Sequence, residues 1–349
     1  MPKELLLVGP RELEYRDYKE APLKPWEVRA RAVMSGISHG TELNLYRGTA
    51  PFHNRTFDRE RRLFVEAPDY QAYPRTLGHE WVGRVVELGP EATGFQVGDL
   101  VHLPNNHRET QTFSAGLSIG YGDIKPLPPG LDCERAIVLA LAGTALQAVH
   151  DGHVKLGDRV AVFGLGAIGL LALQFARLDG AAWVAAIDPI PMRRALASDY
   201  GADLTLDPTA CDPGLEIKSF DRHYGADVAI EASGHYAALH QAIRCVRMGG
   251  TVVAAGYYQG GGTALRLGEE WHHNRVSMIS SMGVWDCPHR DHPMWDIARV
   301  RRLATETLAA GRVRADSLVT HRIPFERAAE AYELIDRRPE ETVKVALTY

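Results

Sequence analysis

Cysteine is scarce in this sequence, and long apolar runs are absent. The 349 residues include only four cysteines, Cys133, Cys211, Cys245 and Cys287, with no Cys-x-x-Cys spacing, so neither a disulfide scaffold nor a cysteine-rich zinc knuckle is expected. No segment approaches the roughly 18 consecutive apolar residues of a membrane-spanning helix, and Met-Pro-Lys-Glu at the start precedes only a short apolar run, unlike a signal peptide. We therefore expect a cytoplasmic protein with reduced thiols.

An excess of positive charge is missing as well. The chain has 39 Lys and Arg against 44 Asp and Glu, a formal net charge of −5. Binding to nucleic acid or to an anionic membrane is therefore not expected as its main function. Four arginines between residues 53 and 62 form a local cluster. Such a run is typical of a solvated loop, and contact with an anionic or highly hydroxylated substrate is the alternative.

The chain has two regions with different sequence patterns, and its length suits about two domains. Up to about residue 134, short β-rich pieces alternate with turn signals, a pattern typical of an antiparallel β domain. From about residue 136, apolar strands alternate with helical stretches of roughly 10 to 15 residues, which predicts an α/β fold with a parallel, doubly wound sheet. We expect strands at 5–8, 28–34, 82–88, 100–103, 160–163, 183–187, 228–231, 251–255, 318–322 and 342–348, and helices at 167–179, 192–200, 236–247, 295–310 and 325–336.

A glycine-rich string follows the strand expected at 160–163 and opens the next helix. It reads Gly164-Leu165-Gly166-Ala167-Ile168-Gly169. In this setting the first glycine allows a tight turn, the second lets backbone N–H groups reach a pyrophosphate, and the third permits close packing of helix on strand. We therefore predict that this segment binds a dinucleotide.

Asp188 ends the second strand of this predicted unit, nineteen residues past Gly169. A carboxylate there can accept both ribose hydroxyls of the adenosine half and would repel a 2′-phosphate, which favours NAD over NADP. Arg193 and Arg194 leave alternatives open, because an arginine at this place can lie over the adenine, reach a 2′-phosphate or face solvent.

Four groups of motifs occur in a distinctive order. The first is 35–42 with Tyr46-Arg47-Gly48, and the second is Gly78-His79-Glu80 with Gly83 and Gly98-Asp99. The third is Gly143-Thr144-Ala145-Leu146 ahead of the glycine-rich string, and the fourth is 231–234 with Gly249-Gly250 and 325–332. Together they resemble the medium-chain dehydrogenase/reductase superfamily, the zinc-type alcohol dehydrogenase relatives, over essentially the whole chain.

The resemblance implies a fold, a reaction and a set of contacts. A GroES-like β domain would span 1–141 and 284–349, with a Rossmann domain over 142–283. The reaction would be NAD-linked interconversion of a secondary alcohol and its ketone, and we favour a polar ring such as a sugar or cyclitol as substrate. A homodimer or homotetramer would be the assembly. The resemblance adds the following cofactor contacts: Thr144, Ser233, Gly256 and the backbone near Met282.

Most zinc ligands of the superfamily are missing. It typically uses a Cys in the first motif, the His of Gly-His-Glu, and a Cys or Glu shortly before the third motif. Here Ser38-His39 stands at the first position, similar to a branch that includes bacteriochlorophyllide dehydrogenase-like proteins, and Ala140 stands near the third. Because catalytic zinc needs three protein ligands, we expect catalysis without it; His39, His79 and Glu80 are the alternative zinc set.

Without zinc, side chains must take the hydroxyl proton while hydride leaves the carbon. His79 is the predicted base, because neutral imidazole is available near pH 7. Glu80 would orient it, Thr41 matches the family's proton-relay hydroxyl, and His39 is the reserve base. The alternative for His79 is a buried structural histidine bonded to Glu80.

Two other functions stay open at this point. A zinc-free enone or quinone reductase needs no alcohol base, but it favours NADPH, which Asp188 would disfavour. A dinucleotide-binding sensor or scaffold without catalysis is the second, and retention of His79, Glu80 and Thr41 argues against it.

A segment near residue 290 is rich in histidine and is a further candidate for metal binding. Cys287, His289 and His292 resemble a metal triad. Their spacing on a Pro-containing loop fits no tetrahedral pattern, so we expect a substrate-facing or interface loop instead.

Overall fold

A computed structural model describes the chain in two compact units. The residues described are 1–50, 55–67, 71–116, 118–119, 122–220, 224–282 and 295–349. Unit 1 comprises Met1–Leu117, Ile124–Leu127 and His321–Tyr349, and unit 2 comprises Ser118–Asp123 and Pro128–Thr320. The loop with Cys287, His289 and His292 lies outside the described residues.

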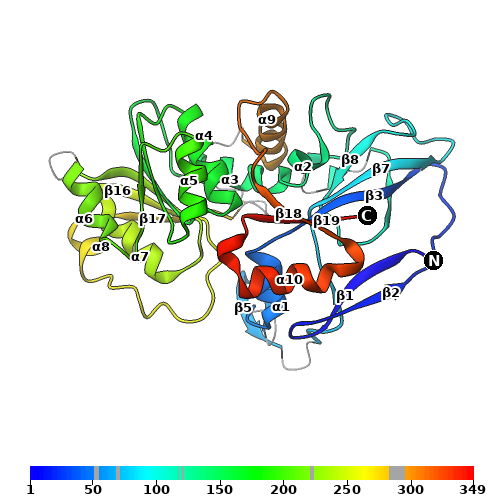
Figure 1. Cartoon of the computed structure of the whole chain (residues 1–349), viewed down its shortest axis with the longest axis horizontal. Coiled ribbons are helices and arrows are strands. Elements are labelled where there is room, and N and C mark those ends of the chain that lie inside the picture. The colour runs from blue at the N-terminus through cyan, green and yellow to red at the C-terminus, as the bar shows by residue number, and fades with distance from the viewer. Residues whose placement is uncertain (51–54, 68–70, 117, 120–121, 221–223, 283–294) are drawn as a thin grey trace. The chain divides into compact units, whose positions relative to one another are not determined.

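Unit 2 is built on a six-stranded parallel sheet (Figure 1). Its spatial order is β14-β13-β12-β15-β16-β17, and every neighbouring pair is parallel. This order is that of a doubly wound dinucleotide-binding sheet, so the predicted fold class is confirmed. The strands are β12 (Arg159–Phe163), β13 (Trp183–Ile187), β14 (Leu204–Leu206), β15 (Ala226–Glu231), β16 (Val246–Ala254) and β17 (Ser277–Ser280).

Helices connect these strands and bury the sheet's apolar residues. β13 is buried along its whole length, as expected for a strand with helices on both faces. α4 begins at Ala167, within the glycine-rich string, and nine of its twelve residues are buried. The described helices of unit 2 are α2 (Cys133–Ala136), α3 (Leu139–Asp151), α4 (Ala167–Leu178), α5 (Pro191–Asp199), α6 (Pro213–Phe220), α7 (Tyr236–Cys245), α8 (Glu270–His273) and α9 (Ile297–Ala309), beside a short β10 (Ser118–Ile119) and β11 (Gly122–Asp123) pair.

Unit 1 is an antiparallel β domain centred on one long strand, β3 (Glu27–Ile37). β3 pairs in antiparallel register with β7 (Trp81–Leu88), β9 (Thr110–Ser114) and β19 (Lys344–Thr348). Its partners therefore come from the first third and from the very end of the sequence. The other strands are β1 (Lys3–Gly9), β2 (Glu12–Asp17), β4 (Arg55–Asp58), β5 (Leu63–Glu66), β6 (Arg75–Thr76), β8 (Leu100–Leu103) and β18 (Val319–Pro324).

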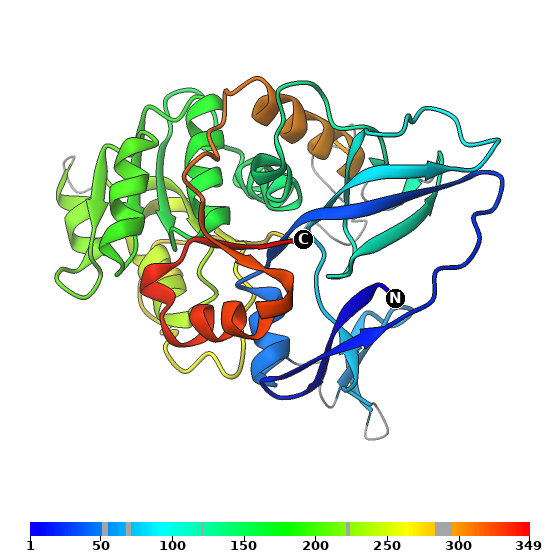
Figure 2. The same ribbon diagram turned by 45° about the vertical axis from the view of Figure 1, so that its right-hand side comes forward.

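The C-terminal segment completes the core of unit 1 (Figure 2). The short helix η2 (Phe325–Arg327), α10 (Ala328–Arg337), η3 (Pro339–Glu341) and β19 follow one another there. Buried residues of this segment share one apolar cluster with β1 and with α1 (Thr41–Arg47). Residues 321–349 therefore belong to the same unit as the first strands of the chain.

The predicted domain boundaries differ from this division. We expect residues 118–123, 128–141 and 295–320 in the β domain from the sequence, whereas they belong to unit 2. The reason is packing: α3, which was not predicted as a helix, contacts both α4 and α9, and ten of its thirteen residues are buried. The third-motif region is therefore part of a helix within the nucleotide unit.

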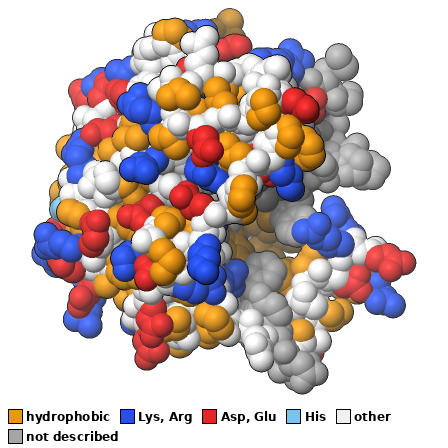
Figure 3. Space-filling model, turned by 90° about the vertical axis from the view of Figure 1, so that its right-hand side faces the viewer, with side chains coloured by type: hydrophobic (Ala, Val, Ile, Leu, Met, Phe, Trp, Pro, Cys, Tyr) orange, Lys and Arg blue, Asp and Glu red, His pale blue; other side chains and the backbone are white. Residues whose placement is uncertain are grey.

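The distribution of charged side chains on the surface agrees with the near balance of acidic and basic residues in the sequence. On the face in Figure 3, Lys and Arg side chains alternate with Asp and Glu, and the described residues form no broad patch of one sign there. Within the described part of the chain, no helix has the length and apolar content needed to cross a membrane.

Candidate active site

His79 and Glu80 lie in unit 1, immediately before β7. Gly78 precedes them with a φ of +106°, and a Cβ at this position would come 2.7 Å from the backbone nitrogen of His107. Both the backbone angle and the close approach require glycine. The Gly-His-Glu motif is therefore a tight corner that presents the two side chains at the start of the strand.

Glu80 is fully buried and forms an ion pair with Lys344 of β19, which is 1% exposed. The Lys344 ammonium also donates to the Ile37 carbonyl at 2.8 Å. Gly36 makes room for the pair, because a Cβ there would collide with the Glu80 carboxylate and the end of Lys344. The charge of Glu80 is thus neutralised inside the core.

Glu42 is the second buried carboxylate and is 1% exposed. Its Oε1 accepts from the Ser38 backbone N–H at 2.8 Å, and its Oε2 meets His107 Nε2 at 3.0 Å and accepts from the Tyr332 hydroxyl. Burial by itself would raise the pKa of Glu42, but attraction to His107 and His79 and the hydrogen bonds of His107 and Tyr332 bring that pKa down to about 2. Glu42 is therefore ionised across the physiological range.

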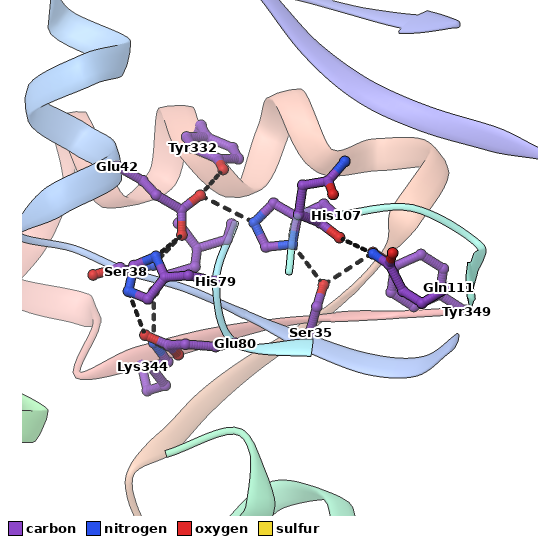
Figure 4. A network of polar contacts seen from close by, with 12 residues as sticks. Ser35, Ser38, Glu42, His79, Glu80, His107, Gln111, Tyr332, Lys344 and Tyr349 are labelled. Carbon is purple, nitrogen blue, oxygen red and sulfur yellow. Dashed lines mark hydrogen bonds and ion pairs between the residues drawn. The ribbon is translucent and has the colours of Figure 1, made fainter. Parts of the chain in front are cut away.

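His79 lies between these two carboxylates (Figure 4). Its Nδ1 is 3.9 Å from Glu42 Oε1, and its Nε2 is 3.7 Å from Glu80 Oε1. The imidazole is 30% exposed, whereas both carboxylates are dry. An accessible imidazole with carboxylates on both sides is suited to accept a proton and to be held as an imidazolium ion.

The other predicted catalytic residues are placed nearby in sequence, on α1 and the turn before it. Thr41 is the exposed first residue of α1, and His39 is half-buried in the preceding turn. The contacts around His79 join it to Glu80 and to Glu42, and sequence reasoning missed Glu42. Its position next to Thr41 in the first motif was the available signal.

The alternative zinc set does not fit this geometry. His39, His79 and Glu80 do not bring one ligand atom each within 4.8 Å of one another, and the Glu80 carboxylate is already paired with Lys344. Of the residues the structure describes, only His240, Glu269 and Glu270 converge in this way. There the guanidinium groups of unit 2 already neutralise both carboxylates: Arg244 pairs with Glu270, and Arg266 with Glu269.

The glycine-rich loop of unit 2 has the shape that a pyrophosphate needs. Gly164 has a φ of +84°, and a Cβ there would come 2.6 Å from Ser233. Around Gly166 the space is open, and no side chain caps the N-terminus of α4 behind it. Gly169 lies against the Gly164 carbonyl, where a Cβ would collide. Free N–H groups of a helix start beside open space fit a dinucleotide phosphate.

Asp188 follows β13 and is 3% exposed. Its Oδ2 accepts from the Leu165 N–H at 2.7 Å and its Oδ1 from the Ile190 N–H at 2.8 Å. Each carboxylate oxygen keeps a second lone pair for a ribose hydroxyl. Arg193 Nη1 is 3.7 Å from Asp188 Oδ2, whereas Arg194 donates to the Asp188 carbonyl and pairs with Asp207. Arg194 is thus held by contacts within the fold.

The cofactor contacts implied by resemblance lie in the same unit. Ser233 is tied to the buried Glu231, which accepts from both its N–H and its hydroxyl. A Cβ at Gly256 would collide with Gly234, so the two loops touch. Thr144 is half-buried in α3, and Met282 is exposed. Glu231 and Ser233 thereby fix the loop that lies against Gly164.

The chain is similar to known dehydrogenases along nearly its whole length. Residues 25–138 match the family model of the alcohol dehydrogenase GroES-like domain, and residues 167–296 match that of the zinc-binding dehydrogenase. D-guloside 3-dehydrogenase of Escherichia coli (strain K12) is 32% identical over 99% of this chain and 100% of its own. L-galactonate-5-dehydrogenase of the same strain is 27% identical over 99% and 98%. The structure of 2R,3R-butanediol dehydrogenase from Bacillus subtilis is 23% identical, with a TM-score of 0.78 and coverage of 100% of both chains.

The Glu80–Lys344 pair generates a prediction about stability. Lys344→Met leaves a dry carboxylate without its counter-charge, so we expect it to lower the free energy of unfolding at pH 7 by about 3–5 kcal/mol. Urea denaturation measures this loss. Adding Glu80→Gln should recover much of it, because the uncompensated charge is gone. Lys3→Met, which removes an exposed pair with Asp17, is the matched control and should change stability by less than about 1 kcal/mol. A Lys344→Met loss no larger than that of the control contradicts the prediction.

Proposed function

The chain belongs to the zinc-type alcohol dehydrogenase relatives of the medium-chain dehydrogenase/reductase superfamily, and we propose that it oxidises a secondary ring hydroxyl of a sugar or glycoside with NAD, or reduces the matching ketone. That it is an alcohol dehydrogenase-like oxidoreductase follows from this membership. The finer assignment depends above all on one observation: an accessible His79 held between two buried carboxylates.

The substrate class is proposed from the relatives and from the chemistry. D-guloside 3-dehydrogenase and L-galactonate-5-dehydrogenase are both named for polyhydroxy substrates. A secondary alcohol gives a ketone when its C–H hydrogen leaves as hydride and its O–H hydrogen leaves as a proton. NAD, when bound, accepts the hydride. The proton passes to His79, directly or through the Thr41 hydroxyl, and the carboxylate charges stabilise the imidazolium that forms.

Catalysis without zinc is part of the proposal. Its support is the donor set: Ser38-His39 and Ala140 replace the usual ligand positions, and His39, His79 and Glu80 do not converge. We further propose a homodimer. β17 pairs with β16 on one side only within the described sheet, and its Met278 is 43% exposed, so a second copy could extend the sheet at this edge.

A substrate screen tests the proposal. Purified protein is assayed for NAD reduction over a panel of methyl glycosides, free sugars, cyclitols and simple secondary alcohols. Zinc content and the mass in solution are measured on the same sample. We expect turnover on members of the sugar panel, activity that survives chelator, well under one zinc per chain and the mass of a dimer. Activity that is lost on zinc removal and restored by zinc contradicts the zinc-free mechanism. NADPH-linked reduction of enones or quinones alone contradicts the proposed reaction.

Cofactor choice is predicted from Asp188. A carboxylate about 4 Å from a phosphate charge costs on the order of 4 kcal/mol at an effective dielectric near 20, so NAD(H) should bind at least tenfold more tightly than NADP(H). Asp188→Ser should reduce this preference. Asp199→Ser, which removes an exposed carboxylate of the same unit paired with Arg314, is the control and should leave the preference unchanged. Equal affinities in the parent, or an unaltered preference in Asp188→Ser, argue against the assignment.

The base is tested by replacing His79. His79→Gln should lower turnover by at least about a hundredfold, because a positioned general base contributes 10²–10⁴-fold. NAD binding and the melting temperature should hardly change, since the imidazole is partly exposed and makes no short hydrogen bond among the described contacts. His39→Gln is compared in parallel. If His39→Gln is inactive while His79→Gln turns over normally, His39 is the base; if both stay active, the acid–base assignment is wrong.

A further inference from the structure

Glu42 belongs to a chain of buried polar groups that leads away from His79 (Figure 4). His107, with no exposed surface, meets Glu42 Oε2 through Nε2 at 3.0 Å and Ser35 Oγ through Nδ1 at 2.7 Å. Ser35 Oγ is in turn 2.9 Å from the Tyr349 hydroxyl. This series of hydrogen-bonded side chains therefore leads from Tyr349 through Ser35 and His107 to Glu42. All four residues belong to unit 1.

The proton positions in this series of hydrogen bonds follow from the two residues at its ends, Glu42 and Tyr349. Glu42 is ionised and can only accept hydrogen bonds, so Nε2 of His107 carries its proton. With His107 in its neutral form, Nδ1 accepts and the Ser35 hydroxyl donates to it. Ser35 Oγ is left to accept from Tyr349, whose pKa is raised by burial so that its hydroxyl stays protonated. All the hydrogen bonds point toward Glu42, and bonds aligned in this way strengthen one another.

The two carboxylates beside His79 therefore differ. Glu80 is paired with the permanently charged ammonium of Lys344, whereas Glu42 is held by the Tyr332 hydroxyl, the Ser38 amide and His107, which in its neutral form donates without adding a charge. Glu42 is the carboxylate that keeps its charge toward His79. A proton on the neutral imidazole of His79 is more stable on Nδ1, which faces Glu42, than on Nε2. That tautomer leaves the Nε2 lone pair free to accept a proton.

We propose that His107 is a positioning residue for the proposed dehydrogenase reaction: it holds Glu42 in the orientation that keeps the proton of His79 on Nδ1 and Nε2 available as the base. This rests on the proposed role of His79. Tyr332 shares the task by donating to the same oxygen, Glu42 Oε2. Oε1 is thereby left to Ser38 and His79.

The test compares two replacements of His107. His107→Leu removes the donor to Glu42, whereas His107→Gln keeps an amide N–H that can donate to the same oxygen. We expect His107→Leu to lower kcat by about ten- to a hundredfold, the range seen when a side chain that orients a functional histidine is removed, with KM for NAD unchanged. His107→Gln should restore most of the activity.

The second readout requires no turnover. In protein labelled with ¹⁵N at histidine, with the His79 signals assigned from His79→Gln, the ring nitrogen shifts report the tautomer. We expect the Nδ1–H form in the parent and in His107→Gln, and a mixture of tautomers in His107→Leu. An Nδ1–H form that persists in folded His107→Leu overturns the proposal, whatever the activity. So does a His107→Gln variant that is as impaired as His107→Leu at an unchanged melting temperature.

Two further variants keep the test decisive. If His107→Leu does not fold, Ser35→Ala replaces it. This change removes the hydrogen bond to Nδ1 and so loosens the His107 ring without removing it. We then expect the same mixture of His79 tautomers and a few-fold loss in kcat. Tyr15→Phe, which removes a hydroxyl bonded to the Phe325 carbonyl in the same unit, is the matched control and should change neither readout. A parent enzyme that turns over no alcohol, yet shows the tautomer coupling, contradicts the proposed function and leaves the role of His107 supported.

Discussion

Two carboxylates buried in the interior of unit 1 constrain the rest of its structure, because each needs partners that compensate its charge. Glu42 and Glu80 each lose the hydration that would stabilise them, and an uncompensated buried charge costs several kcal/mol. Compensation for Glu80 comes from Lys344 on the last strand. For Glu42 it comes from His107 and from Tyr332 of α10. The return of the chain's end to its first domain is therefore an electrostatic requirement as well as an apolar one.

The kind of compensation matters as much as its presence. A cation cancels the charge of Glu80, while the charge of Glu42 is stabilised by the Tyr332 hydroxyl, the Ser38 amide and the Nε2 donor of His107. His79, placed between the two, meets an asymmetric field. In the proposed mechanism this asymmetry favours a proton on Nδ1 of neutral His79 and leaves Nε2 free to accept the proton of the alcohol.

Unit 2 uses buried carboxylates in a related way, to shape backbone loops. Asp188 accepts from the N–H of Leu165 and so ties the glycine-rich loop to the end of the second strand. Glu231 accepts from the N–H groups of Ser233 and Gly234 and holds the neighbouring loop. Burial raises the pKa of Glu231, and its several donors keep it bonded in place. Loops fixed before a ligand arrives lose less entropy when it binds.

The sequence by itself determined the doubly wound sheet and the dinucleotide loop, because these depend on local spacing: glycines at 164, 166 and 169 after an apolar strand, and an acid at the end of the next strand. The return of the last strand to the first domain was expected from the family resemblance and not from spacing. The sequence also singled out His79 and Glu80 from a short motif. Only the tertiary structure decided that Lys344, His107 and Tyr332 converge on the two carboxylates, and that α3 packs within the nucleotide unit. Residues hundreds of positions apart leave no periodic signal when they meet, since their contact is set by how strands pair and helices pack and not by spacing along the chain.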